Sequence, residues 1–383
     1  MVKIIVATIM RPTGDTGVQT HFCSYIRWME VNGHPVSLVT PYSAPRWLVY
    51  PVFAVRRILN GVSGLASVWW YRYWHKLFLE VALRSRLVSG DECIIYAQCP
   101  LSASAAMRVR KNSQQRVVLV VHFNVSQADE WADKRMIPSH GGYAESIRQF
   151  EVQTFAQLDG VVFVSEFMRK ALLGRIPSIS GVPYAVIPNF VSDPGFSKKS
   201  STFDADLLIV GTLESRKNQA YALEIVAAAL KLGKKFSLTV AGDGPDRAGL
   251  ELMAGTLGIK AQVQFLGFVP DAARLFSSHR ACLHVARMES FGIVLIEAMS
   301  RGVPVFAPQV GGMPEVFTDG VEGCYLPLDA PDEAAFILLD WFSEGGHRLE
   351  EARSKARAKF LTRFESDVVA RQLYTFLLDA GQK

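Results

Sequence analysis

The stretch MESFGIVLIEAMSRG, residues 288–302, decides the fold of this chain. Residues 293–299 are apolar on nearly every face of a helix, Gly302 stands where a helix-terminating glycine is expected, and Pro304 follows. The pattern predicts a buried helix with a defined end. A short strand is predicted just before it, at 281–285. The intervening turn therefore leads from a strand end into a helix start, which is where ligands bind in α/β sheets.

The predicted helix start suits an anionic group such as a phosphate. The backbone amides of Gly292, Ile293 and Val294 would point outward with the positive end of the helix dipole behind them. Two carboxylates, Glu289 in the turn and Glu297 on the helix, bracket this position. Because carboxylates repel a phosphate, we expect them to bind neutral hydroxyls of a sugar or ribose. The alternative is a helix-capping role for Glu289 and a solvated side chain at Glu297.

Length and composition limit the class of protein. A chain of 383 residues, 49% hydrophobic and with 29 glycines, is long enough for two domains with separate cores. Its five cysteines form no C-x-x-C pair, which predicts a reducing cytoplasm and neither a zinc site nor a disulfide framework. The opening MVKIIVATIM lacks the length and cleavage site of a signal peptide and is predicted to be a buried strand. No apolar run has the length of a membrane span.

Short Val- and Ile-rich segments alternate with amphipathic segments along the first half of the chain. This alternation predicts parallel βαβ units, with strands at 3–8, 36–40, 93–96, 117–121, 160–164 and 184–187. A second series begins with strands at 207–210 and 238–241. Residues 192–204 between the two series are rich in Ser, Lys, Gly and Pro and are predicted to be a linker. The fold class is therefore α/β with two doubly wound domains.

A basic pair follows the predicted strand at 207–210. Arg216 and Lys217 lie in a strand-to-helix turn, where they can neutralise a diphosphate without a metal or can simply be solvated. Asp204 and Asp206 form a D-x-D triplet, but the triplet precedes its strand, so we expect no metal there. In the first half, His122 ends a buried strand, a position that is more often structural than catalytic.

Several of these motifs, taken together, resemble a known family. The segments Glu289-Ser290-Phe291-Gly292, Glu297-Ala298-Met299, GVPV at 302–305 and GGMPE at 311–315 look like the donor-site signature of family-four retaining glycosyltransferases of the GT-B fold. The resemblance implies two Rossmann-like doubly wound domains that face each other across a cleft. Residues 1–191 would bind the acceptor and residues 205–362 the nucleotide sugar. Residues 363–383 would form a terminal helix that crosses back to the first domain.

The resemblance also implies roles for single residues. Glu289 would hold sugar hydroxyls rather than attack the sugar, Glu297 would hold the ribose, and His122 would contact the donor sugar. Arg216 and Lys217 would stabilise the leaving diphosphate, with no metal and no other cofactor. The remaining donor-binding residues would be Gly17, Gly211, Thr212, Phe268, Val269, Ser290, Phe291, Gly292, Ile293 and Val294.

Thr212 departs from the family pattern, which has an arginine there, so one cationic contact is missing. A sugar-nucleotide-binding protein without turnover is therefore the alternative function. A dehydrogenase is disfavoured because the G-x-G-x-x-G spacing is absent. A lipid-linked or glycan acceptor of bacterial cell-surface polysaccharide or lipopolysaccharide synthesis is the expected partner of the donor.

Residues 45–88 interleave aromatic and basic side chains, and the first half of the chain is basic. The residues to 190 carry 20 Lys and Arg against 12 Asp and Glu, a net +8, whereas the rest carry 21 against 24. Such a stretch suits the headgroup layer of an anionic membrane, on the inner face of the cytoplasmic membrane. A pair of packed helices is the alternative, and nucleic acid is disfavoured because no binding-module pattern accompanies it. The proposed acceptor or membrane residues are Trp69, Trp70, Arg72, Trp74 and Lys76.

Overall fold

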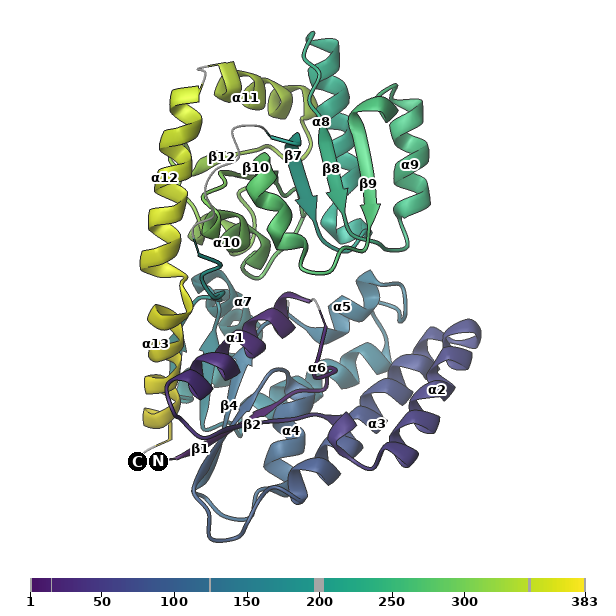
Figure 1. Ribbon diagram of the computed structural model, residues 1–383. Coiled ribbons are helices and arrows are strands. Elements are labelled where there is room, and N and C mark those ends of the chain that lie inside the picture. Colours follow the sequence, from purple (N-terminus) through teal and green to yellow (C-terminus); the bar gives the residue numbers. More distant parts are fainter. Residues whose placement is uncertain (1, 15, 124, 196–202, 344–345, 382–383) are drawn as a thin grey trace. The chain divides into compact units, whose positions relative to one another are not determined.

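The computed structural model describes the chain except for residues 1, 15, 124, 196–202, 344–345 and 382–383 (Figure 1). It divides into two compact units: unit 1 is Met1–Pro188 with Val369–Lys383, and unit 2 is Asn189–Val368. The chain thus divides after residues 188 and 368. The expected bounds at 191, 205 and 363 stay predictions. Residues 196–202 of the expected linker lie outside the described residues.

Unit 1 is built on a six-stranded parallel sheet with the order β2-β1-β3-β4-β5-β6. Every strand predicted in this half is present, and the central strands β1, β3, β4 and β5 are short, largely buried runs rich in Val and Ile. The chain proceeds from β1 to β2 on one side and from β3 onward on the other, so its direction switches between β1 and β3. The strands are β1 (Lys3–Ala7), β2 (Val36–Val39), β3 (Cys93–Ala97), β4 (Gln115–Val121), β5 (Gly160–Phe163) and β6 (Tyr184–Val186).

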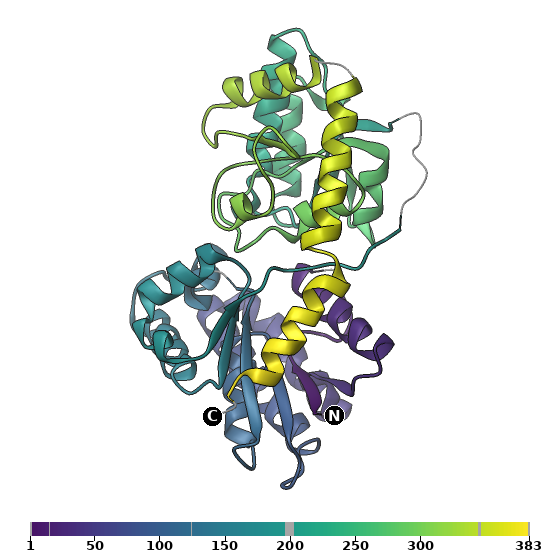
Figure 2. The ribbon, with the colours of Figure 1, turned by 90° about the vertical axis from the view of Figure 1, so that its left-hand side faces the viewer.

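Helices connect these strands, and a helix from the end of the chain completes unit 1. Arg116 on β4 donates to the carbonyls of Leu378 (2.8 Å) and Ala380 (2.5 Å), which fixes the end of the last helix, α13, against the sheet (Figure 2). The helices are α1 (Gly17–Val31), α2 (Arg46–Val62), α3 (Gly64–Arg84), α4 (Pro100–Val109), α5 (Gln127–Asp133), α6 (Gly142–Phe155), α7 (Glu166–Arg175) and α13 (Ser366–Asp379), with 3-10 turns at Pro41–Ser43 and Pro177–Gly181.

Unit 2 contains a second six-stranded parallel sheet, with the order β12-β11-β10-β7-β8-β9. Its direction switches between β7 and β10. The edge strand of this sheet occupies residues 263–267, and residues 268–271 continue as a loop. The strands are β7 (Ala205–Val210), β8 (Leu238–Ala241), β9 (Val263–Gly267), β10 (His279–Leu283), β11 (Val305–Ala307) and β12 (Gly323–Tyr325).

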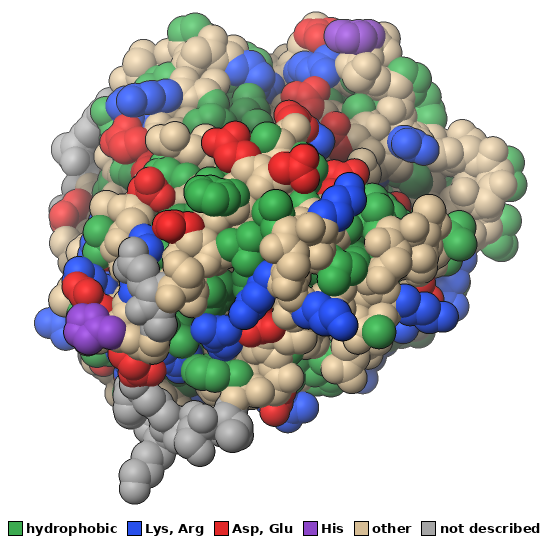
Figure 3. All heavy atoms as spheres, turned by 90° about the horizontal axis from the view of Figure 1, so that it is seen from above, with side chains coloured by type: hydrophobic (Ala, Val, Ile, Leu, Met, Phe, Trp, Pro, Cys, Tyr) green, Lys and Arg blue, Asp and Glu red, His purple; other side chains and the backbone are tan. Residues whose placement is uncertain are grey.

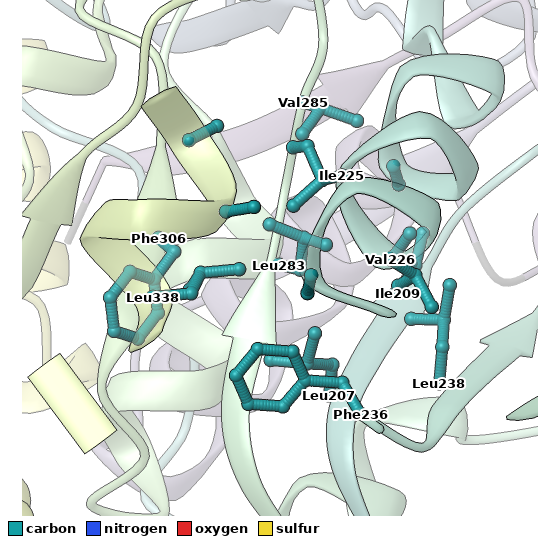
Figure 4. Close-up of a cluster of buried hydrophobic side chains, with 14 of the residues drawn as sticks. Leu207, Ile209, Ile225, Val226, Phe236, Leu238, Leu283, Val285, Phe306 and Leu338 are labelled. Carbon is teal, nitrogen blue, oxygen red and sulfur yellow. The ribbon is translucent and has the colours of Figure 1, made fainter. Parts of the chain in front are cut away.

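The core of unit 2 lies where helices cover this sheet. Leu207, Leu283 and Phe306 from the strands pack with Ile225 of α8 and Leu338 of α11 (Figure 4). Helix α10 packs instead on α12. The helices are α8 (Gln219–Lys231), α9 (Arg247–Thr256), α10 (Ile293–Ser300), α11 (Pro331–Ser343) and α12 (Gly346–Arg363), with 3-10 turns at Ser215–Lys217, Lys260–Gln262, Ala272–Ser278 and Met313–Glu315.

The surface carries charges of both signs. The face shown in Figure 3 mixes Lys and Arg with Asp and Glu side chains, and hydrophobic side chains lie among them. Within the described part of the chain, no helix combines the length and the apolar character that crossing a membrane requires.

Candidate active site

The carboxyl ends of β7 and β10 mark the switch point of the unit 2 sheet. These two strands are neighbours, but the chain leaves them in opposite directions, so the loops that follow them separate and leave room for a ligand. The turn after β8 packs closely against the turn after β7. A Cβ atom on Gly242 would lie 1.9 Å from the Gly211 carbonyl oxygen, and one on Gly244 would lie 2.3 Å from that of Leu213. Only glycine therefore fits at both positions.

One carboxylate joins the two loops. Lys217, from the turn after β7, donates to Oε1 of Glu289, from the turn after β10. Nε2 of His284 lies 3.3 Å and Nη1 of Arg216 lies 3.9 Å from the same oxygen. Arg216 also forms an ion pair with Glu214 at 2.9 Å. The structure thus brings the predicted pair Arg216 and Lys217 to the predicted carboxylate of Glu289, which lies 72 residues after Lys217 in the sequence.

Backbone contacts hold these side chains in place. The Arg216 carbonyl accepts from the Arg287 amide (3.1 Å), and the Glu289 carbonyl accepts from the Gly312 amide (2.9 Å). Gly311 has φ +60°, and a Cβ there would lie 2.0 Å from the Glu289 carbonyl oxygen. Glycine at 311 is therefore required for the close approach of a second loop to the backbone of Glu289.

The charges around Glu289 determine its protonation state. Burial by itself would raise the pKa of Glu289, but Lys217, His284 and Arg216 outweigh burial and hold the pKa below its ordinary value. Burial lowers the pKa of His284, and the nearby Lys217 lowers it further against the opposing effect of Glu289. At neutral pH the site thus contains an ionised carboxylate, a neutral imidazole and two cationic side chains.

The start of α10 lies directly after this cluster. Gly292 is its N-cap residue with φ +98°, and the helix begins at Ile293. Phe291 is buried, and its ring packs on Phe364 at 5.9 Å between centroids. The amides of the first turn have no partner within a helix, so they offer hydrogen bonds to an anion beside the Arg216 and Lys217 pair.

Glu297 lies one turn further along α10. Burial raises its pKa to about 7, Asp271 adds to the effect, and Arg301 opposes it. The loop after β9 supplies Phe268, which is 63% exposed, and the half-buried Val269. Thr212 is exposed, and its carbonyl accepts from the Gln219 side chain at 2.9 Å.

Unit 1 has its own cluster at the carboxyl edge of its sheet. Thr16 caps α1, and Gly17 is the first residue of that helix. His122 follows β4 and is buried, and its Nε2 lies 3.5 Å from the Tyr96 hydroxyl.

The second aspartate of the D-x-D triplet, Asp206, makes contacts within unit 2. Asp206 lies within β7, accepts from the amide and hydroxyl of Ser237, and pairs with Arg280 at 2.9 Å. Across the described residues, no group of three or more His, Cys, Asp and Glu side chains could hold a metal ion.

Sequence and structure comparisons identify the family. Two family models match the chain, "Glycosyltransferase Family 4" over residues 16–193 and "Glycosyl transferases group 1" over residues 196–359. The chain belongs to the family-four retaining glycosyltransferases. Phosphatidyl-myo-inositol mannosyltransferase from Mycobacterium tuberculosis is 26% identical over 337 residues, which are 85% of this chain and 82% of the relative.

Solved structures show the same fold. HepE from Anabaena in complex with UDP and glucose superposes with a TM-score of 0.68 at 18% identity, covering 99% of both chains. A glycosyltransferase from Rickettsia africae has a TM-score of 0.68 at 12% identity, covering 100% of this chain and 99% of its own. The glycosyltransferase described here therefore has the GT-B fold.

The aromatic and basic residues of α3 do not form one surface in this glycosyltransferase, contrary to what their grouping implies. Arg72 is buried and Lys76 partly buried, and both lie 5.2 Å from the Phe150 ring of α6. The Trp70 indole donates to the Val52 carbonyl, and Trp74 packs on Phe78. Only Trp69 of the five is exposed. Helical spacing explains the outcome, because positions 69, 70 and 72 point in different directions on one helix.

His284 is the site residue that the sequence analysis missed. It comes directly after β10 in the same way that His122 comes after β4. The signal that drew attention to His122, a polar side chain at the carboxyl end of a buried strand, was therefore present at His284 too.

The raised pKa of Glu297 makes a prediction for folding. The folded state keeps the proton between the ordinary carboxyl pKa and about 7, whereas the unfolded chain has lost it, so this contribution to stability falls as pH rises through that window. Relative to wild type, Glu297→Gln should gain roughly 2 kcal/mol of unfolding free energy between about pH 5 and pH 8, after allowance for partial exposure. Urea denaturation at both pH values measures this.

The matched control is Glu333→Gln on α11, which makes the same substitution at an exposed carboxylate. A pH-independent difference for Glu297→Gln would contradict the assignment of a buried proton to this residue.

Proposed function

We propose that this glycosyltransferase moves a sugar from a nucleotide diphosphate sugar to a lipid-linked or glycan acceptor, without a metal ion. One observation carries the proposal: Arg216 and Lys217 converge on Glu289 beside the start of α10, at the switch point between β7 and β10. Cations, free helix amides and an ionised carboxylate in one place match a ligand that has both a diphosphate and sugar hydroxyls.

The chemistry follows from where charge develops. Cleavage of the bond between the sugar and the diphosphate leaves negative charge on the departing phosphate. Arg216, Lys217 and the amides of Gly292 to Val294 would stabilise that charge, which is electrostatic catalysis by groups already in place. Glu289 is ionised and would accept hydrogen bonds from sugar hydroxyls, so we assign it a positioning role rather than nucleophilic attack.

We also propose roles for the other residues of the donor site. Glu297 would hold the ribose hydroxyls, and His122, at the carboxyl edge of the unit 1 sheet, would contact the donor sugar. Gly17, Gly211, Thr212, Phe268, Val269, Ser290 and Phe291 would complete the donor site.

The relatives indicate which substrates to test first. The HepE structure contains UDP and glucose, and the name of the mycobacterial relative specifies transfer of mannose to a phosphatidylinositol. These names support a hexose donor and a lipid acceptor for this chain.

A protein that binds a sugar nucleotide without turnover is the second candidate. Thr212 favours it, because an uncharged, exposed side chain stands where the family pattern has an arginine. Transfer or hydrolysis of a nucleotide sugar by the purified protein would exclude this candidate.

Two substitutions at the Glu289 contact should separate its roles. Glu289→Ala removes the contacts to the sugar but leaves both cations, so kcat/KM should fall by about a hundredfold or more while nucleoside diphosphate still binds. Lys217→Met removes a cation and leaves the carboxylate, so the affinity for nucleoside diphosphate should fall instead. Initial rates and calorimetric titration with UDP measure the two effects.

The control is Asp329→Ala, which removes an exposed ion pair with Arg287 and should leave both quantities unchanged. Unchanged turnover in Glu289→Ala would refute the site.

Removal of divalent metal ions should leave activity intact. Arg216 and Lys217 supply the positive charge that a metal ion supplies to the diphosphate in other transferases. Rates measured after dialysis against EDTA should match untreated enzyme. Full loss of activity that Mg²⁺ or Mn²⁺ restores would contradict the proposal and return attention to Asp204 and Asp206.

An exposed surface on α2 and α3 supports attachment to an anionic membrane. Trp47, Ile58 and Val62 of α2 are 74%, 70% and 80% exposed, and Trp69 and Tyr73 of α3 are also exposed. Arg46 and Arg57 are exposed on α2, and no Asp or Glu occurs between residues 46 and 79. We call these residues the α2 surface. Exposed aromatic and aliphatic side chains beside arginines suit a lipid interface with negative headgroups.

Flotation with vesicles tests the α2 surface. Wild type should float with vesicles that contain phosphatidylglycerol and much less with pure phosphatidylcholine. The double variant Trp47→Ser, Ile58→Ser should lower the bound fraction about tenfold, because apolar burial drives such binding. Leu252→Ser, which changes an equally exposed leucine on α9, is the matched control. Equal flotation of the double variant and wild type would overturn the assignment.

A further inference from the structure

In unit 1, two buried histidine side chains contact the hydroxyl group of a buried tyrosine. Nε2 of His21 lies 2.9 Å and Nε2 of His122 lies 3.5 Å from the Tyr96 hydroxyl oxygen. The two imidazole rings lie edge to face with centroids 4.5 Å apart. Their exposed fractions are 2% for His21, 0% for Tyr96 and 9% for His122. The group is thus a small polar cluster inside an apolar core.

The cluster lies at the switch point of the unit 1 sheet. His21 is on α1, the helix that follows β1, and Tyr96 is on β3, which pairs with β1. His122 follows β4, the next strand in the sheet. This is the place in a doubly wound sheet where ligands are expected.

The Tyr96 hydroxyl has one proton and two lone pairs, so it can donate to at most one of the two imidazoles and can accept an N–H from either. When it donates to one ring and accepts from the other, the tautomers of His21 and His122 are coupled: one ring carries its proton on Nε2 and the other on Nδ1. Nε2 of His122 faces Tyr96, so the direction of the Tyr96 proton decides whether Nδ1 of His122 is a donor or an acceptor.

The surroundings keep His21 and Tyr96 neutral. Burial lowers the pKa of His21 well below its ordinary value, and His122 adds to this. Burial raises the pKa of Tyr96 above its ordinary range. Tyr25 on α1 packs edge-on against Tyr96 with centroids 5.5 Å apart and is likewise held as a neutral phenol by burial.

We propose that Tyr96 and His21 are positioning residues for glycosyl transfer: the Tyr96 hydroxyl, held by His21, fixes the ring orientation and the tautomer of His122. This inference rests on the proposed function, in which His122 contacts the donor sugar. A fixed tautomer presents one defined hydrogen-bonding partner to a sugar hydroxyl. A ring that interconverts between tautomers presents the required form for only part of the time.

Steady-state kinetics test the catalytic part of the proposal. Tyr96→Phe should lower kcat about tenfold and change KM for the donor less than about twofold, since the lost contact acts on orientation rather than donor affinity. His21→Gln, which keeps a hydrogen-bonding group near the hydroxyl, should retain more activity than His21→Ala. Tyr25→Phe removes a buried hydroxyl from the same aromatic cluster and should behave as wild type. Equal kcat values for Tyr96→Phe and wild type, or equal losses in Tyr96→Phe and Tyr25→Phe, would overturn the proposal.

Nitrogen NMR of the histidine rings tests the geometric part without any turnover. In ¹⁵N-labelled protein, with the signals assigned by a His122→Gln variant, His122 should show a single neutral tautomer. In Tyr96→Phe it should show a mixture, whereas Tyr25→Phe should keep the wild-type pattern. An unchanged His122 tautomer in Tyr96→Phe would overturn the inference. If wild type transferred no sugar, the proposed function would fail, and the NMR result alone would decide whether Tyr96 orients His122.

Discussion

The contact between Lys217 and Glu289 is the interaction on which the unit 2 site depends. It joins the loop after β7 to the loop after β10, two loops that the strand order directs apart. A carboxylate this deeply buried is costly unless it is paired, and removing one partner of such a pair typically costs about 3–5 kcal/mol. The pairing therefore fixes the path of the chain into α10, and the anion-binding end of that helix is positioned as a consequence.

The same contact removes an apparent conflict in the chemistry. A carboxylate near a diphosphate would repel it, yet Glu289 lies four residues before the helix start at Ile293. Because Lys217 and Arg216 lie beside Glu289, these two cations offset its negative charge while the carboxylate stays ionised. One residue can then accept hydrogen bonds from sugar hydroxyls next to two residues that attract phosphate. No proton has to be taken up or released for both to act at neutral pH.

Sequence patterns were sufficient for most of the fold and for only part of the site. Buried strands such as β4 are continuous runs of β-branched residues and were readily predicted. The edge strand β9 alternates half-buried and exposed residues over only five positions, and β11 and β12 are three residues each, so none gave a clear signal. The family motif indicated Glu289 and Lys217 separately. Their contact spans 72 residues of chain and depends on the strand order, which local patterns do not contain.

The direction in which side chains point was the other property that the sequence patterns did not predict. The alternation of aromatic and basic residues on α3 suggested one surface, but the helix turns Arg72 inward and Trp69 outward. The exposed apolar side chains of the α2 surface lie mainly on the preceding helix. The composition of α2 is less distinctive in the sequence, because α2 has two tryptophans fewer than α3. Only the packing of the two helices shows which of them keeps its apolar side chains exposed.

The switch points of the two sheets differ in chemistry. The difference suggests which role each unit has in the proposed reaction. At the β7 and β10 edge, burial is offset by full charges, namely two cations around one carboxylate. At the β1 and β3 edge, burial keeps the His21 imidazole and the Tyr96 phenol neutral, and the phenol lies between the rings of His21 and His122. A charged cluster in a partly buried site stabilises developing negative charge, whereas a neutral cluster supplies directed hydrogen bonds and little net field. Under the proposed function, unit 2 would therefore lower the energy of the departing diphosphate, and unit 1 would orient hydroxyl groups without competing for the anion.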